Sequence, residues 1–282
     1  MWQLLPALRE LVEGRQTGAL ATVVRASGSA PQKPGARLLL REDGSTVGTV
    51  GGGTVEARVL EHLEACLRTG KAGTISFDLV RDLGMCCGGS MEVFMERIEA
   101  PDRLVLFGAG HVAQPTASLA RSVGFAPVIV DEREDWNTPE RFPGAEHLLL
   151  PPAEAVERLA LRDDDWILIM THEHRQDEEV LELCLPRPHR YLGMIGSKRK
   201  VFQTLQRIAA RGPLPELGRL HAPIGAPLGA VGPEEIAVSI VSELIALRRG
   251  AALPGMSVTH SPRLQQVLEG ALSPTDAARE EG

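Results

Sequence analysis

The feature that most limits the fold of this chain is a glycine motif placed directly after a buried strand. Residues 103–107 form an apolar run typical of a strand covered on both faces, and Gly108-Ala109-Gly110-His111-Val112-Ala113 follows at once. This is the GxGxxG fingerprint with alanine in place of the third glycine, which the fingerprint tolerates. The glycines let the backbone turn tightly and approach a diphosphate, which amides at the start of the next helix can bind. The motif predicts a Rossmann-like, doubly wound parallel sheet.

The pattern of apolar residues changes near residue 100. Before it, short strand-like runs alternate with glycine-rich turns, which predicts a small mixed α+β domain over residues 1–100. After it, strands and helices alternate as in βαβ units, so residues 101–250 are expected to form the Rossmann-like domain. The segment 251–282 mixes glycine, proline, serine and charge, and a flexible C-terminal tail is expected there.

Composition excludes several classes of function. The 282 residues carry a net charge of −7 and few aromatic side chains, which argues against nucleic-acid binding. The apolar runs are shorter than the roughly 20 residues that span a bilayer, and the first residues lack the basic region of a signal peptide. The four cysteines are expected to be cytosolic thiols. The sequence therefore predicts a cytoplasmic protein with no nucleic-acid or membrane partner.

Asp131 ends the next predicted strand, 21 residues after Gly110, where an acid can bind a ribose 2′-hydroxyl. Together with Gly108, Gly110 and His111 it indicates a nucleotide or diphosphate site. The alternative is a Rossmann fold whose glycines serve packing alone. Hydride transfer also needs a general acid or base, for which His111, His172 and Tyr191 are available, but no pattern singles out one of them.

Two further groups follow predicted strands at the same edge of the sheet. Thr171-His172-Glu173-His174 offers imidazoles, chiefly His172, although the segment also suits a polar loop before an acidic helix start. Ser197, Lys198 and Arg199, with Lys200 beside them, could bind an anion such as a phosphate. Solvated helix charge is the competing interpretation.

The N-terminal half holds two more candidates. Gly51, Gly52 and Gly53 precede Thr54, a potential helix N-cap, and resemble an anion-binding nest, or else a tight strand-to-helix turn. Cys86 and Cys87 lie in a glycine-flanked loop, where amides can lower a thiol pKa, so they are candidates for molybdenum or sulfur handling as well as for packing.

Taken together, these motifs resemble the XdhC/CoxI family of xanthine dehydrogenase accessory proteins over roughly residues 17–249. The matching segments lie in both halves and in order: residues 22–31, residues 48–53 with Glu56, residues 87–89, residues 108–113, residues 171–174, residues 191–197, Leu220-His221-Ala222-Pro223-Ile224-Gly225 and residues 232–237.

The resemblance implies an accessory protein rather than a catalyst. It implies a chaperone that binds the molybdenum cofactor (molybdopterin), protects it during sulfuration by a cysteine desulfurase, and delivers it to a xanthine dehydrogenase-type molybdenum hydroxylase. A pterin phosphate would rest on residues 108–113 or beside Lys198 and Arg199, with Cys87, or Cys86, near the metal or the incoming sulfur. A homodimer is also implied. An NAD(P)-dependent oxidoreductase and a non-catalytic assembly scaffold remain alternatives.

Overall fold

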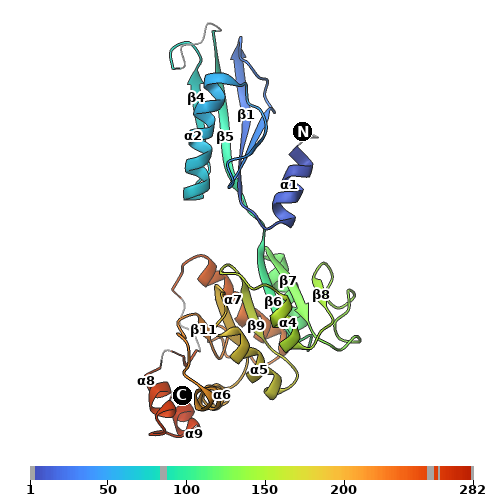
Figure 1. Cartoon of the computed structure of the whole chain (residues 1–282), viewed down its shortest axis with the longest axis vertical. Coiled ribbons are helices and arrows are strands. Elements are labelled where there is room, and N and C mark those ends of the chain that lie inside the picture. Colours follow the sequence, from blue (N-terminus) through green and yellow to red (C-terminus); the bar gives the residue numbers. More distant parts are fainter. Residues whose placement is uncertain (1–3, 83–87, 253–256, 260, 281–282) are drawn as a thin grey trace. The chain divides into compact units, whose positions relative to one another are not determined.

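A computed structural model describes residues 4–82, 88–252, 257–259 and 261–280. The chain divides into two compact units, Met1–Pro101 and Asp102–Gly282, whose division lies one residue from the predicted boundary (Figure 1). Within the described residues, no helix combines the length and apolar character that crossing a membrane requires.

The first unit is a five-stranded antiparallel sheet with strand order β3-β2-β1-β5-β4. Its elements are α1 (Leu4–Glu13), β1 (Gly18–Gly28), β2 (Arg37–Arg41), β3 (Thr46–Gly48), α2 (Gly53–Thr69), β4 (Gly73–Asp78) and β5 (Gly89–Ile98). Side chains alternate across β1 because successive residues of a strand face opposite sides. Ala19 and Ala21 pack with α2, whereas Leu20 packs with α1 on the other face.

The second unit is built on a six-stranded parallel sheet with strand order β11-β10-β9-β6-β7-β8. Its strands are β6 (Asp102–Phe107), β7 (Phe125–Val130), β8 (Glu146–Leu148), β9 (Trp166–Ile169), β10 (Tyr191–Met194) and β11 (Leu220–His221). The order reverses between β6 and β9, which are hydrogen-bonded neighbours. In open α/β sheets, ligands bind at the carboxyl ends of the strands flanking such a reversal.

Helices cover both faces of this sheet, which confirms the predicted doubly wound α/β fold. They are α3 (Ala113–Ser122), α4 (Pro152–Arg158), α5 (His174–Cys184), α6 (Lys198–Arg211) and α7 (Pro233–Arg248). Val105 and Phe107 of β6 pack in one core with α4, α5 and α6, and Leu104 and Leu106 pack in the other with α3 and α7 (Figure 1). Both cores are continuous and apolar, so the carboxyl edge is supported from both sides.

The end of the chain differs from the expected flexible tail. It forms two short helices, α8 (Pro262–Leu268) and α9 (Pro274–Glu280). Leu264, Val267 and Ala277 are buried in the same core as α6. Burial of these apolar side chains offsets the conformational entropy lost when the segment is ordered. The polar composition of the segment gives no sign of this burial.

Candidate functional site

Gly108 fixes the loop after β6 against the loop after β9. Its φ is +115°, and a Cβ at this position would lie 2.3 Å from the carbonyl oxygen of Met170. Its N–H donates to Val130 O at 2.8 Å, which ties the same residue to the end of β7. Only glycine combines this φ with such a close backbone approach. Gly108 is therefore required by the fold itself.

Gly110 differs from Gly108, although the sequence motif treats the two alike. A Cβ on Gly110 would meet no described atom within 4 Å. The residue lies just before α3, where Gln114 N donates to Gly110 O at 3.3 Å and Pro115 has no N–H, so an anion there would meet the amides of residues 111–113 at the positive end of the helix dipole. Gly110 thus leaves open space beside amides suited to an anion.

Asp131, at the end of β7, is bound within the protein. Its Oδ2 accepts hydrogen bonds from the Ala109 N–H at 2.8 Å and from Arg133 Nη2 at 2.6 Å, and its Oδ1 accepts from Arg133 Nε at 2.8 Å. Burial alone would raise the pKa of Asp131, but the hydrogen bonds from Arg133 and Ala109 outweigh it and lower the pKa. Both oxygens are engaged, so the predicted ribose contact would have to replace one of these bonds.

The loop after β7 adds an arginine–tryptophan cluster that sequence reasoning missed. Arg141 Nη1 donates to the carbonyl oxygens of Ala109 (2.9 Å) and Trp136 (2.6 Å). The guanidinium groups of Arg133 and Arg141 lie 4.9 and 4.6 Å from the Trp136 ring centroid. His111 is exposed and meets the same ring edge-on at 5.2 Å. These contacts place the guanidinium groups of Arg133 and Arg141 beside the glycine loop. The one sequence signal for this cluster is that Arg133 lies two residues after Asp131.

The loop after β9 is held by Asp177 of α5. Asp177 Oδ1 accepts from Thr171 N at 2.9 Å and from Thr171 Oγ1 at 2.7 Å. His172 and His174 are exposed, and His172 Nε2 lies 3.4 Å from Glu173 Oε1. The structure brings His172 to the same edge as Gly108, because Gly108 contacts Met170 and Thr171.

Three basic residues follow β10, namely Lys198, Arg199 and Lys200. Lys200 Nζ donates to Asp177 Oδ2 at 2.5 Å and to Ile195 O at 3.2 Å, so it is part of the framework. Ser197 caps α6 by accepting from Lys200 N at 3.2 Å. Lys198 is half-buried in the first turn of α6, and Arg199 is exposed there.

In the first unit, Gly51, Gly52 and Gly53 have positive φ values of 139°, 68° and 56°. The N-cap of α2 is Gly52 and not the predicted Thr54, because the carboxylate of Glu56 reaches back over the helix start. Glu56 Oε2 accepts from Val50 N (3.3 Å), Gly52 N (3.2 Å) and Thr49 Oγ1 (2.5 Å). This resembles a capping box. The predicted anion nest is thus filled by a side chain of the protein.

Cys86 and Cys87 lie outside the described residues, so their predicted metal or sulfur role stays a prediction. Burial raises the pKa of the Cys66 thiol, and it raises the pKa of Cys184 to about 12, as expected for packed cysteines. Among the described residues, no group of three or more His, Cys, Asp or Glu side chains is arranged to hold a metal ion.

Tyr191 is not placed to act as a base. It is fully buried, and its hydroxyl donates to Glu243 Oε2 at 3.0 Å. Burial, the charge of Glu243 and this hydrogen bond raise the pKa of Tyr191 well above its usual value of 10.0. His221 stacks on the same ring at 4.6 Å and shares the Glu243 carboxylate through Nδ1 at 2.9 Å.

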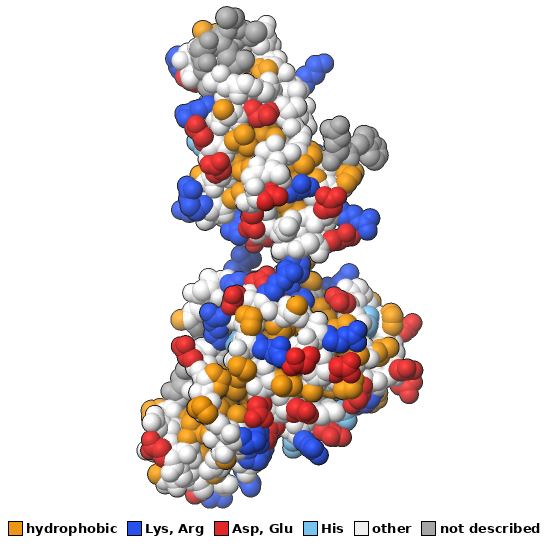
Figure 2. Space-filling model, in the orientation of Figure 1, with side chains coloured by type: hydrophobic (Ala, Val, Ile, Leu, Met, Phe, Trp, Pro, Cys, Tyr) orange, Lys and Arg blue, Asp and Glu red, His pale blue; other side chains and the backbone are white. Residues whose placement is uncertain are grey.

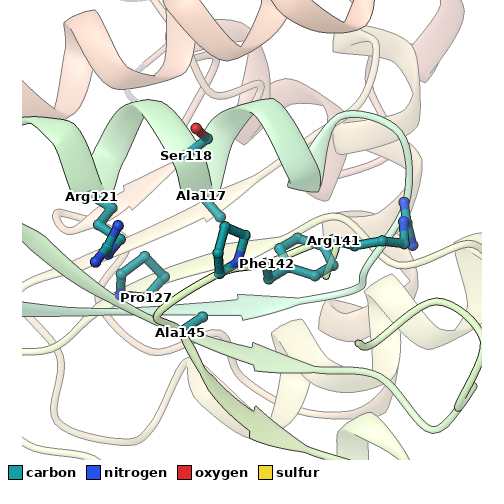
Figure 3. A pocket seen from close by; sticks show the side chains of 8 residues that line it. Ala117, Ser118, Arg121, Pro127, Arg141, Phe142 and Ala145 are labelled. Carbon is teal, nitrogen blue, oxygen red and sulfur yellow. The ribbon is translucent and has the colours of Figure 1, made fainter. Parts of the chain in front are cut away.

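Three surface hollows of the second unit are lined by residues other than the Gly108–Gly110 loop. The hollow between α3 and the loop before β8 has a volume of about 50 Å³, room for little more than a water molecule or two (Figure 3). In Figure 3 the Arg141 side chain leaves this hollow toward the start of α3. Two larger grooves, of about 400 and 430 Å³, share Leu185, Pro186 and Pro215 beyond the C-terminal end of α5.

The surface charge is mixed. On the face drawn in Figure 2, Lys and Arg side chains are interspersed with Asp and Glu over both units. On this face the mixture of charges agrees with the negative net charge of the chain. A small anion is the ligand that a local pair of arginines suits.

Comparison with protein families gives two matches, one in each unit. The model of the XdhC Rossmann domain matches residues 104–244, and the model of the XdhC and CoxI family matches residues 11–78. The first match contains Gly108, Asp131, His172 and Lys198, and the second contains Gly51 and Glu56.

Individual relatives agree with these matches. The chain is 38% identical to the uncharacterized protein YqeB of Escherichia coli over 83% of its own length, but it spans only 44% of YqeB. It is 24% identical to the molybdenum cofactor insertion chaperone PaoD of Escherichia coli, covering 86% of this chain and 87% of PaoD. A crystal structure of a xanthine dehydrogenase from Bacillus halodurans is 25% identical, with a TM-score of 0.52, covering 93% of this chain and 98% of that one.

Proposed function

The chain belongs to the XdhC and CoxI family, and from this premise we propose that it is an accessory protein of molybdenum enzymes. In this proposal it binds the molybdenum cofactor as cargo, protects it while a cysteine desulfurase exchanges an oxo ligand for sulfur, and delivers it to a xanthine dehydrogenase-type molybdenum hydroxylase. It acts in the cytoplasm as a homodimer. The relative named as a molybdenum cofactor insertion chaperone supports this proposal over a catalytic role.

The observation that carries the proposal is the open space at Gly110. Gly108 is locked under Met170, so the loop is rigid, while Gly110 faces no described atom where a Cβ would be. A phosphate in that space meets amides at the start of α3 and the positive end of the helix dipole. The phosphate of a pterin cofactor has the size and charge that such a cradle binds.

Charge at the loop favours an anion as well. An unpaired Asp131 would repel a phosphate, but Arg133 pairs with its carboxylate and Arg141 lies on the carbonyl of Ala109. Lys198 and Arg199 add positive charge in the first turn of α6. His172 lies at the same edge and can donate a hydrogen bond to the cargo. The role of these residues is to hold and orient the cargo, since chemistry at the metal is left to the desulfurase.

The test is to purify the protein from cells that make the cofactor and to measure what it carries. Released pterin is assayed by fluorescence after oxidation, and molybdenum by elemental analysis. We expect both in the wild type and at least tenfold less of both in Gly110→Val, whose Cβ would meet no described atom within 4 Å. Wild-type protein without pterin would remove the proposal.

Two observations count against the oxidoreductase alternative. Asp131 is bound within the loop, and Tyr191 is buried with a raised pKa. An assembly scaffold without cofactor affinity is separated from the chaperone by the same purification, because a scaffold would retain the partner enzyme but no pterin.

A further inference from the structure

Helix α7 presents an exposed face that none of the roles above uses. At 100° per residue, six side chains lie on one side of the helix, within about 100° of arc. This set, the outer face of α7, is Glu234, Glu235, Val238, Ser242, Ile245 and Arg249, the last being the residue that follows the helix. The opposite side of α7, with Ala237, Ile240 and Leu244, is buried against α3 and the sheet.

The centre of the outer face is apolar and accessible. Val238 is 46% exposed, and Ile245, seven residues later, is half-buried and packs in part against the core beneath α7. Val231 and Leu228, just before the helix, are 85% and 58% exposed and extend the apolar surface beyond its N-terminal end. Single exposed apolar residues need no explanation. Val238 and Ile245 on the helix, with Val231 and Leu228 before it, together form the apolar surface from which an interface is inferred.

Charge on the outer face is arranged by position. The acids Glu234 and Glu235 lie at the N-terminal end and Arg249 at the C-terminal end, as the helix dipole favours. Glu235 accepts from Val231 N at 3.0 Å, and Arg248 donates to Val123 O at 2.8 Å, so these two serve their own chain. Glu234 and Arg249 are exposed at opposite ends.

This arrangement is complementary to itself when the helix is reversed. A two-fold axis beside Val241 and Ser242 sets Val238 opposite Ile245 of a second copy. The same register sets Glu234 opposite Arg249 of that copy, at both ends of the pair. A parallel pairing would oppose acid to acid and would align the two dipoles unfavourably. Closed dimers use such isologous contacts, in which one patch meets itself.

We propose that the outer face of α7 binds a second copy of this chain in antiparallel orientation. The proposal gives a surface to the homodimer included in the proposed function, and it does not depend on cofactor binding. Val238 and Ile245 supply the buried apolar centre, the small Ser242 allows close approach near the axis, and the Glu234–Arg249 pairs fix the register.

The first test uses Val238→Lys with Val24→Lys as its control. Val24, in β1, is 43% exposed and receives the same substitution away from α7. Lysine at 238 follows Glu234 by four residues, a spacing that supports the helix, so the variant should fold. By sedimentation velocity over a concentration series, we expect dimers of wild type and of Val24→Lys, and at least a tenfold weaker dimer of Val238→Lys. Circular dichroism and Tm check folding.

The second test exchanges the end charges. Glu234→Arg or Arg249→Glu alone opposes like charges and should weaken the dimer, whereas Glu234→Arg/Arg249→Glu together should restore it. A monomeric wild type would overturn the inference. It would also be overturned if the wild type were monomeric and Val238→Lys failed to capture a molybdenum enzyme, since the outer face of α7 would then bind that enzyme and not a second copy. A wild-type dimer that Val238→Lys leaves unchanged would keep the homodimer but overturn this surface.

Discussion

Lys200 Nζ lies 2.5 Å from Asp177 Oδ2, in an ion pair whose side chains are only 14% and 2% exposed. The pair joins the start of α6 to the start of α5. Because Asp177 also accepts two hydrogen bonds from Thr171, the loops after β9 and β10 are held together at the carboxyl edge of the sheet. The contact therefore links two of the loops that form the candidate site.

Lys200→Met should destabilise the protein strongly, because it leaves the Asp177 carboxylate buried without its cation. Breaking a buried pair from one side costs about 3–5 kcal/mol in the free energy of unfolding. Urea unfolding of the second unit measures it. Arg199→Met, an exposed cation one residue away, should change stability by no more than about 0.5 kcal/mol and is the matched control.

The double variant Asp177→Asn/Lys200→Met separates the ion pair from packing. Asparagine is uncharged and its oxygen can still accept from Thr171, so we expect it to recover more than half of the loss. If Lys200→Met had the same free energy of unfolding as the wild type, the ion pair would not contribute to the stability of the second unit.

The pH dependence of stability should report on Asp131. Its pKa is lowered in the folded protein from a value of 3.8, so it binds a proton less readily folded than unfolded. The stabilisation is therefore complete above pH 3.8 and is lost as the pH falls through the folded pKa. Asp131→Asn should lower the unfolding free energy at neutral pH by about 1–3 kcal/mol, because Arg133 loses its charged partner.

The difference between wild type and Asp131→Asn should shrink as the pH falls below 3.8. Urea titrations from neutral to acid pH measure both curves, with Glu132→Gln, an exposed neighbour, as the control. Parallel curves at all pH values would contradict the proposed pairing.

The strand–glycine–helix unit could be predicted from sequence because its determinants are local. A buried run followed by Gly108 and Gly110 leaves few backbone paths, and alternation of strands and helices fixes the sheet. The motif could not predict that Gly108 is packed against the backbone while Gly110 faces open space. This difference depends on Met170, which is remote in sequence and meets Gly108 alone.

The partners of charged side chains could not be predicted, because they are settled by tertiary packing. Asp131 was available for a ligand by position, and the nest at Gly51–Gly53 was a candidate for an external anion. In the fold Asp131 turns to Arg133 and Ala109, while Glu56 fills the nest. In α8, Leu264 and Val267 carry a core contact within a polar segment, which composition hides.

Thiol labelling should divide the four cysteines into two classes. Alkylation needs a thiolate, and burial raises the pKa of both Cys66 and Cys184. We expect rapid iodoacetamide labelling of the native wild type and none of Cys86→Ala/Cys87→Ala. Labelling of that double variant at the wild-type rate would mean that a buried thiol is accessible. Cys87→Ala alone should keep the fold but weaken cofactor retention, and full retention would remove the cysteine from the proposed function.

Gly110→Val is the sharpest test of the phosphate cradle, because the structure separates binding from stability at this residue. A Cβ at 110 would meet no described atom within 4 Å, so Tm should stay near that of the wild type, whereas a Cβ at 108 would collide with Met170 and Gly108→Val should lower Tm. The valine fills the space of the phosphate and removes roughly two hydrogen bonds to a charged group, at about 1.5–3 kcal/mol each. Pterin retained after purification should fall at least tenfold. Ser118→Val, on the exposed side of α3, controls for valine in the helix and should retain pterin. Equal retention by a folded Gly110→Val would move the cofactor site away from this loop, and the charge around Lys198 and Arg199 would be the next place to examine.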